Sequence, residues 1–173
     1  GSAYAYSVFK VPLAQALGWS STQTSLAFTL AIFFLGLSAA VFGPFVERRG
    51  PRASALLAAV LFASGHVLAG VAIATGSLWL FFIGYGVVGG IGLGIGYISP
   101  VSTLVAWFPH RRGMATGMAV LGFGAGALLA SPVAARLIAT VGLPTTFFVL
   151  GATFLVLMSA GASYIAKPPA GWT

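Results

Sequence analysis

The residues of this sequence that could do chemistry are few, and most of them lie in one short turn. The turn holds the single acidic residue of the chain together with three arginines and two glycines: Gly43, Glu47, Arg48, Arg49, Gly50 and Arg52. A carboxylate at a helix end can pair with neighbouring guanidinium groups and lose that pairing when the groups separate. The turn therefore indicates a charge latch, although a simple orientation turn would need only the arginines.

Other reactive groups are scarce, which excludes most enzymatic chemistry. One acidic residue leaves no carboxylate pair for acid–base catalysis, and zero cysteines leave no disulfide, thiolate metal site or cysteine nucleophile. His66 is the other group that titrates near neutral pH inside an apolar stretch, but one carbonyl partner would satisfy it. We expect no enzyme activity, no metal and no cofactor.

The elements that carry these residues must lie in a membrane. The chain has 173 residues, of which 59% are hydrophobic and 5% charged, whereas a soluble domain carries about a quarter charged residues. The mean hydropathy is +1.05 over the whole chain. A net charge of +7 could suggest nucleic-acid binding, but the basic residues form small clusters beside apolar runs. This placement suits membrane orientation, and we expect no nucleic-acid partner.

The apolar runs predict an all-α integral membrane bundle. Five of them are long enough to cross a bilayer: 22–46, 53–75, 78–108, 114–140 and 145–166. Residues 1–9 are too short to cross and are interpreted as the end of a truncated first helix. Residues 10–21 are predicted to be an interfacial loop. The run 78–108 is longer than a bilayer needs, so we expect a tilt or a kink near Pro100.

The positive charges predict the orientation of this bundle. Six basic residues fall on one side of the alternating spans, in two turns and at the C-terminus: Arg48, Arg49, Arg52, Arg111, Arg112 and Lys167. Lys10 and Arg136 fall on the other side. Because short basic loops stay in the cytoplasm, both basic turns and the C-terminus are predicted to face the cytoplasm across a cell (inner or plasma) membrane. Two glycine-rich stretches, 84–96 and 113–126, are predicted to form close helix–helix contacts.

The first basic turn resembles the signature of the major facilitator superfamily, Gly-x-x-x-Asp-Arg-x-Gly-Arg-Arg, which lies between the second and third helices. Gly43, Arg48, Gly50 and Arg52 match it, and Glu47 stands for the usual Asp. In that family the loop joins the two halves of the transporter and stabilises the outward-open state. The resemblance implies a gating role for this turn and for Arg111 and Arg112 in the second basic turn.

Other segments are similar to the oxalate/formate antiporter family. They include 94–100, the Trp-Phe-Pro-His-Arg-Arg-Gly stretch at 107–113, and 122–126, in the right order. The resemblance implies that residues 1–173 are the N-terminal six-helix half of a twelve-helix carrier, whose C-terminal half is absent here. It also implies an anion site lined by Tyr4, Tyr97 and Phe123. Phe123 stands where the oxalate carrier has tyrosine, which removes one hydroxyl donor.

The leading hypothesis is a secondary carrier of small organic anions, such as oxalate, formate or related monocarboxylates, which works by alternating access and exchange. Its expected partners are the anion, the lipid bilayer and the C-terminal half of the same carrier. Two alternatives stay open: a major facilitator carrier of another substrate, and a small non-transporting membrane assembly partner. An intramembrane enzyme ranks last, because no nucleophile–base pair or metal-ligand spacing lies within the spans.

Overall fold

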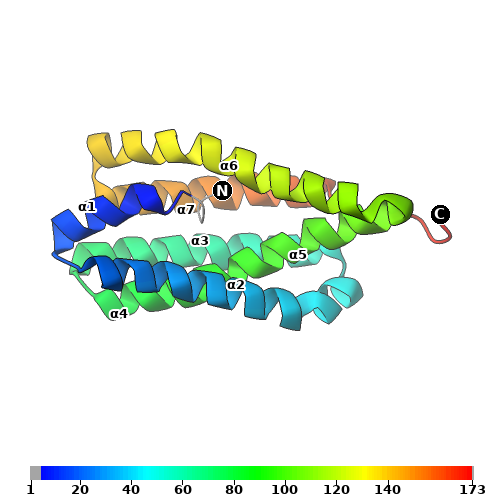
Figure 1. The fold of residues 1–173 in the computed structure, drawn as a ribbon, viewed down its shortest axis with the longest axis horizontal. Helices are drawn as coiled ribbons and strands as arrows, with labels where there is room; N and C mark the ends of the chain where they lie inside the picture. Colours follow the sequence, from blue (N-terminus) through cyan, green and yellow to red (C-terminus); the bar gives the residue numbers. More distant parts are fainter. Residues whose placement is uncertain (1–4, 173) are drawn as a thin grey trace.

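The computed structural model describes residues 5–172, and this part of the chain is helical with no strand. Most helices run roughly along one long axis, and the C-terminal segment extends from one end of the bundle (Figure 1). In chain order the elements are α1 (Ser7–Leu17), α2 (Ser21–Arg49), α3 (Pro51–Thr75), α4 (Leu78–Phe81), the π-helix η1 (Phe82–Val88), α5 (Gly89–Trp107), the 3-10 turn η2 (Pro109–Arg111), α6 (Arg112–Val141) and α7 (Leu143–Tyr164).

Five helical segments are long and apolar enough to cross a membrane. They are Ser21–Arg49, Pro51–Thr75, Leu78–Trp107, Pro109–Val141 and Leu143–Tyr164. Each coincides with one of the five predicted spans to within a few residues. The predicted fold class, an all-α membrane bundle, is confirmed.

The predicted loop over 10–21 is wrong, because α1 continues through it as far as Leu17. Phe9 and Leu13 lie one turn apart and are both buried, at 1% and 0% exposure, so packing holds this helix in spite of Pro12. Gly18 ends it with a φ of 66°, and its N–H donates to the Ala14 carbonyl at 3.0 Å. The connection to α2 is therefore only a tight turn.

The longest predicted span, 78–108, contains an irregular segment that lies before Pro100. A seven-residue π-helix, Phe82–Val88, joins α4 to α5, whereas α5 stays helical through Pro100. π-helical turns are rare and often occur at functional positions. This one brings Tyr85 into the bundle core, where its side chain is 4% exposed.

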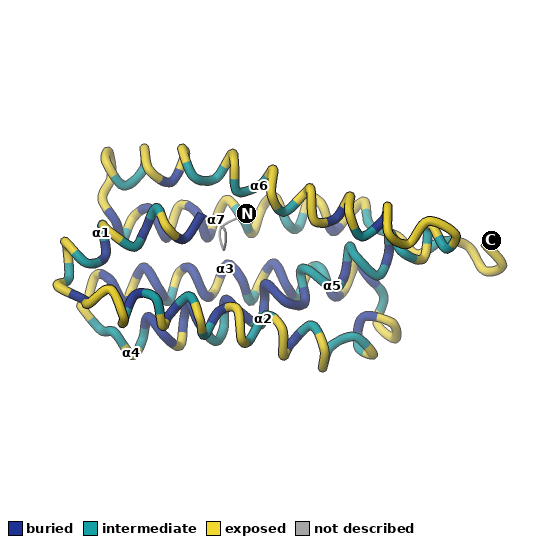
Figure 2. Tube along the Cα trace, in the orientation of Figure 1, coloured by how far each residue is buried: buried dark blue, intermediate teal, exposed yellow. Residues whose placement is uncertain are grey.

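Burial is uneven among the helices, as Figure 2 shows. In the most apolar window of each span, 56% of α3 residues and 61% of the α4–α5 segment are buried. The corresponding share is 17% for α2 and 11% for α6. The core thus lies along α3 and α5, and α2 and α6 keep large exposed faces.

Glycines permit the close approach of the core helices. A Cβ on Gly65 would lie 2.7 Å from the Gly84 carbonyl oxygen, and one on Gly90 would lie 2.7 Å from the Ala31 carbonyl oxygen. The predicted packing face over 84–96 is therefore present. On α6 the predicted contacts are not formed within the described residues and stay a prediction for a partner outside them. Four glycines have no heavy atom within 4 Å of an added Cβ: Gly113, Gly117, Gly122 and Gly124. Few residues of α6 pack against the rest of the bundle.

Candidate functional site

Two of the three predicted site residues meet in the structure. The rings of Tyr97 on α5 and Phe123 on α6 pack with centroids 5.2 Å apart and planes inclined at 58°. Both side chains are half-buried. Tyr4 lies outside the described residues. The structure thus pairs one hydroxyl donor with one apolar ring.

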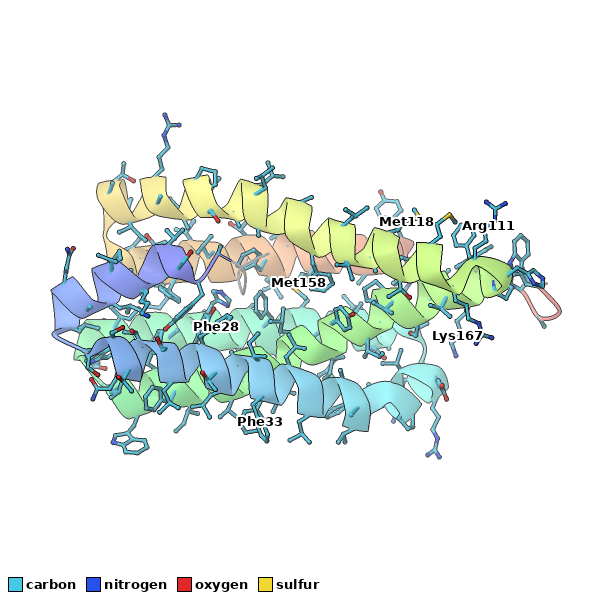
Figure 3. All side chains as sticks on the ribbon, viewed as in Figure 1. Phe28, Phe33, Arg111, Met118, Met158 and Lys167 are labelled. Carbon is cyan, nitrogen blue, oxygen red and sulfur yellow. The ribbon has the colours of Figure 1, made fainter. Side chains whose placement is uncertain are left out.

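Phe123 also lines a cavity of about 400 Å³ between α3, α5, α6 and α7. Its walls are apolar and include Phe62, Met118, Phe154 and Met158. Figure 3 shows Met118 on α6 and Met158 on α7. Among residues 5–172, no charged or hydroxyl side chain lines this cavity, so these walls supply shape and a low dielectric rather than a counter-charge. The nearby Tyr97 hydroxyl is the group that can donate to a carboxylate.

His66 lies in an aromatic enclosure within the core and is 1% exposed. Its Nδ1 lies 2.9 Å from the Phe62 carbonyl oxygen. Because a carbonyl oxygen only accepts, Nδ1 is the protonated ring nitrogen and donates this hydrogen bond. Its Nε2 has no hydrogen-bond partner within residues 5–172. Phe62 and Phe154 lie edge-on to the imidazole with centroids 4.5 and 5.2 Å away, and Tyr85 is 5.9 Å away. The expected carbonyl partner is present, and it satisfies one of the two ring nitrogens.

Sequence reasoning missed two buried tyrosines, Tyr85 beside this histidine and Tyr6 beside Tyr85. The ring of Tyr6 lies 5.2 Å from Tyr85 and stacks on Phe28 at 5.3 Å. Its hydroxyl donates to the Thr24 carbonyl. The available signal for Tyr85 was its place in the glycine-rich stretch 84–96, because small residues let helix backbones approach closely.

The first basic turn has the backbone that its glycine pattern predicts. Gly50 has a φ of 85° and is the residue at which α2 ends and α3 begins. Its N–H donates to the Val46 carbonyl at 2.9 Å, and its own carbonyl accepts from Ser54 Oγ at 2.8 Å. By contrast, Gly43 has open space beside it. Hydrogen bonds therefore hold the backbone of the turn at Gly50, whereas another helix would have room to approach at Gly43.

The expected pairing of the Glu47 carboxylate with its neighbouring arginines is not formed. Glu47, Arg48, Arg49 and Arg52 are all exposed, and no ion pair within 4.0 Å is found among the described residues. Lys167 instead donates to the backbone carbonyl of Glu47. The Glu47 carboxylate thus remains open to a partner outside the described residues.

The second basic turn lies at the same end of the bundle. Arg111 and Arg112 are exposed at the junction of η2 and α6. Figure 3 shows Arg111 and Lys167 at this end, which we call the basic end. The two predicted basic turns therefore form one surface with the segment that follows α7.

A bundle of five membrane-crossing segments, with an aromatic-walled cavity in its middle and cationic turns at one end, defines a multi-pass membrane protein. No cluster of metal-binding side chains is present in the described part of the chain. The chain belongs to the major facilitator superfamily, whose family model matches residues 1–171. Because this superfamily consists of transporters, the expectation that the chain is not an enzyme is confirmed.

Several known proteins are similar to this chain over nearly its whole length. An uncharacterised major facilitator-type transporter of Escherichia coli, YhjX, is 31% identical over 169 residues, covering 98% of this chain and 41% of its own. The oxalate:formate antiporter of Oxalobacter formigenes is 27% identical over 168 residues, covering 97% of this chain and 39% of its own. Monocarboxylate transporter 9 of rat is 28% identical over 162 residues, covering 94% and 31%. The chain thus spans about two fifths or less of these relatives' lengths.

Proposed function

We propose that this chain is part of a secondary carrier that moves small organic anions across a membrane by alternating access and exchange. The observation that carries this proposal is its similarity to an oxalate:formate antiporter and to a monocarboxylate transporter, over 97% and 94% of the chain. Both relatives are named as carriers of small carboxylates. The resemblance is spread over the spans as well as the basic turns.

The Tyr97–Phe123 pair supports a carboxylate site beside the mid-bundle cavity. The Tyr97 hydroxyl is the donor we assign to the substrate, and the Phe123 ring forms an apolar wall. Because Phe123 offers no hydroxyl, the site suits a monocarboxylate better than oxalate, which has two carboxylates to satisfy. Tyr4 is assigned to the same site by the family resemblance. No cation lines this cavity in the described residues, so we assign the counter-charge to the second half of the carrier.

The exposed faces of α2 and α6 support a second bundle packed against this one. The open glycine face of α6 offers the close backbone approach that joins helices in lipid. We assign this partner to the C-terminal half of the same carrier, with residues 1–173 as the N-terminal half.

We assign gating to the two basic turns, Gly43–Arg52 and Arg111–Arg112, placed on the cytoplasmic side of a cell membrane. Six of the eight basic residues lie in these turns and at Lys167, which is the arrangement that the positive-inside rule favours. The unpaired Glu47 carboxylate and the open space at Gly43 suit a contact made with the second half. Such a contact forms in one state of the carrier and breaks in the other.

Uptake by the purified complete transporter in proteoliposomes tests this proposal. We expect carrier-dependent uptake of at least one labelled small carboxylate, formate, pyruvate or oxalate, and competition by the others. Uptake of amines or sugars without any carboxylate would favour a carrier of another substrate. A protein that moves none of them, and that co-purifies with another membrane protein, would favour the assembly partner.

A further inference from the structure

The segment that follows α7 is bound to the end of α5 by two tryptophans. Trp107 Nε1 donates to the Ala166 carbonyl at 2.9 Å, and Trp172 Nε1 donates to the Trp107 carbonyl at 2.9 Å. The two indole rings meet edge to face with centroids 5.0 Å apart. Residues 165–172, which we call the strap, are therefore bound at both of their ends to one residue of α5.

The same segment is bound to the end of α2. The Lys167 ammonium donates to the backbone carbonyl of Glu47, in the last turn of that helix. Terminal carbonyls of a helix lack partners within the helix and carry partial negative charge, so a lysine there satisfies one of them. Since α2 leads into the first basic turn and α5 into the second, the strap contacts the helices before both turns.

A cavity of about 300 Å³ lies under the strap. Lys167 and Pro168 border it on one side, and Glu47, Ser102 and Thr103 border it on the other. Pro100, which lines the mid-bundle cavity, precedes Ser102 by two residues on α5. The strap thus covers the bundle between the ends of α2 and α5, on the basic-end side of the candidate site.

We propose that the strap is a latch at the basic end. When docked, it holds the ends of α2 and α5 together and covers the cavity between them. When released, it opens that cavity to water and lets the two basic turns move independently. Its role in setting the population of carrier states rests on the proposed function, whereas the docking itself does not.

The hydrogen-bond pattern explains why this contact is suited to a latch. All three of its hydrogen bonds are to backbone carbonyls and are exposed, so each contributes only about 1 kcal/mol. Loss of one such bond changes an opening equilibrium about fivefold. Three such bonds keep the strap docked at rest, and each is weak enough for the docking to be reversible.

Cysteine labelling tests the latch in the complete transporter, purified in nanodiscs so that both faces meet the reagent. Ser102→Cys, in a background without other cysteines, reports opening of the strap cavity to a water-soluble maleimide. We expect slow labelling of this cysteine. Lys167→Met should raise the rate about fivefold, and Trp172→Ala about tenfold or more, because it removes a ring contact and a hydrogen bond.

Matched variants separate the latch from general loosening. Lys167→Arg keeps a donor and should restore slow labelling. Lys10→Met and Trp79→Ala replace the same residue types elsewhere and should leave the Ser102→Cys rate unchanged. A cysteine at Thr140, exposed on α6 away from the strap, should label at the same rate in all variants.

Unchanged labelling of Ser102→Cys in both strap variants would overturn the proposal, as would an equal rise at Thr140→Cys or in the two control variants. Transport is measured with the same purified variants after reconstitution into proteoliposomes. If labelling responds as expected and no carboxylate is moved, the latch stands and the proposed function fails. If transport is present and labelling does not respond, the latch fails alone.

Discussion

The phenol ring of Tyr97 packs on the ring of Phe123, 26 positions later in the chain, with centroids 5.2 Å apart. This contact joins α5, which is mostly buried, to α6, which is mostly exposed. It lies beside the apolar cavity that Phe123 lines. The Tyr97 hydroxyl thus lies beside a phenylalanine ring that offers no hydroxyl of its own. Substitutions that add or remove one hydroxyl group can therefore test the role of each ring.

Tyr97→Phe should weaken carboxylate binding about five- to tenfold and leave the melting temperature nearly unchanged. The substitution removes one donor and keeps the ring that packs on Phe123. Titration of the complete transporter with formate or pyruvate measures the first effect, and thermal denaturation the second. Phe123→Tyr is the matched variant, which should improve binding of oxalate. Unchanged binding together with a lower melting temperature would show that Tyr97 only packs.

Glu47→Gln should shift the complete transporter away from its outward-open state without destabilising the bundle described here. The Glu47 side chain makes no ion pair among the described residues, and Lys167 contacts only its backbone carbonyl, which glutamine keeps. Accessibility of cysteines introduced on the two sides of the central path measures the shift, which we expect to be about fivefold. Gln23→Glu, at the other end of α2, serves as the control. Identical labelling in wild type and Glu47→Gln would refute the gating role.

Gly65→Ala should destabilise the bundle, whereas Gly124→Ala should not. A methyl group at Gly65 would lie 2.7 Å from backbone atoms of Gly84 and Gly89, and backbone cannot yield as a side chain can. Overpacking of this kind typically costs about 1–3 kcal/mol. At Gly124 the space is open, and alanine is the better helix former by about 1 kcal/mol. Thermal denaturation in detergent checks both, and a stable Gly65→Ala protein would contradict the packing described for α3 and the π-helix.

Membrane-spanning segments were predictable from the sequence because each is set by a long apolar run between polar or glycine-containing turns. The turn at Gly50 was also predictable, because glycine interrupts the apolar pattern there. In the structure this single glycine, with a positive φ, joins α2 to α3. The extension of α1 to Leu17 was not, because burial of Phe9 and Leu13 outweighs the local effect of Pro12. The π-helix also depends on contacts with α3, which a local pattern does not contain.

The candidate site was predictable only through family resemblance. Composition does not distinguish Tyr97 and Phe123 from lipid-facing aromatics, and it is the fold that brings them together. One part of the environment of His66 could be predicted from the sequence, because its carbonyl partner is four residues earlier on the same helix. Its aromatic neighbours Tyr85, Phe147 and Phe154 come from two other elements of the bundle. Long-range contacts such as Lys167 with Glu47 leave no trace in a single sequence.

We propose a mode of transport from the titratable groups that the described spans hold. The described spans hold no carboxylate in mid-membrane, because Glu47 lies at the basic end, and His66 is enclosed by aromatic rings and 1% exposed. Proton coupling needs a group that titrates while it faces each side in turn. We therefore expect exchange or facilitated diffusion of an anion, without proton coupling through the residues of this chain.

Counterflow tests this account most directly. Proteoliposomes of the complete transporter are preloaded with unlabelled formate and exposed to labelled formate, with equal pH on both sides and a protonophore present. We predict that labelled formate accumulates transiently, that it does so only in preloaded vesicles, and that His66→Gln, which keeps a donor for the Phe62 carbonyl, exchanges at a similar rate. Uptake that requires an inward proton gradient, and that His66→Gln abolishes in a protein of normal stability, would contradict the account.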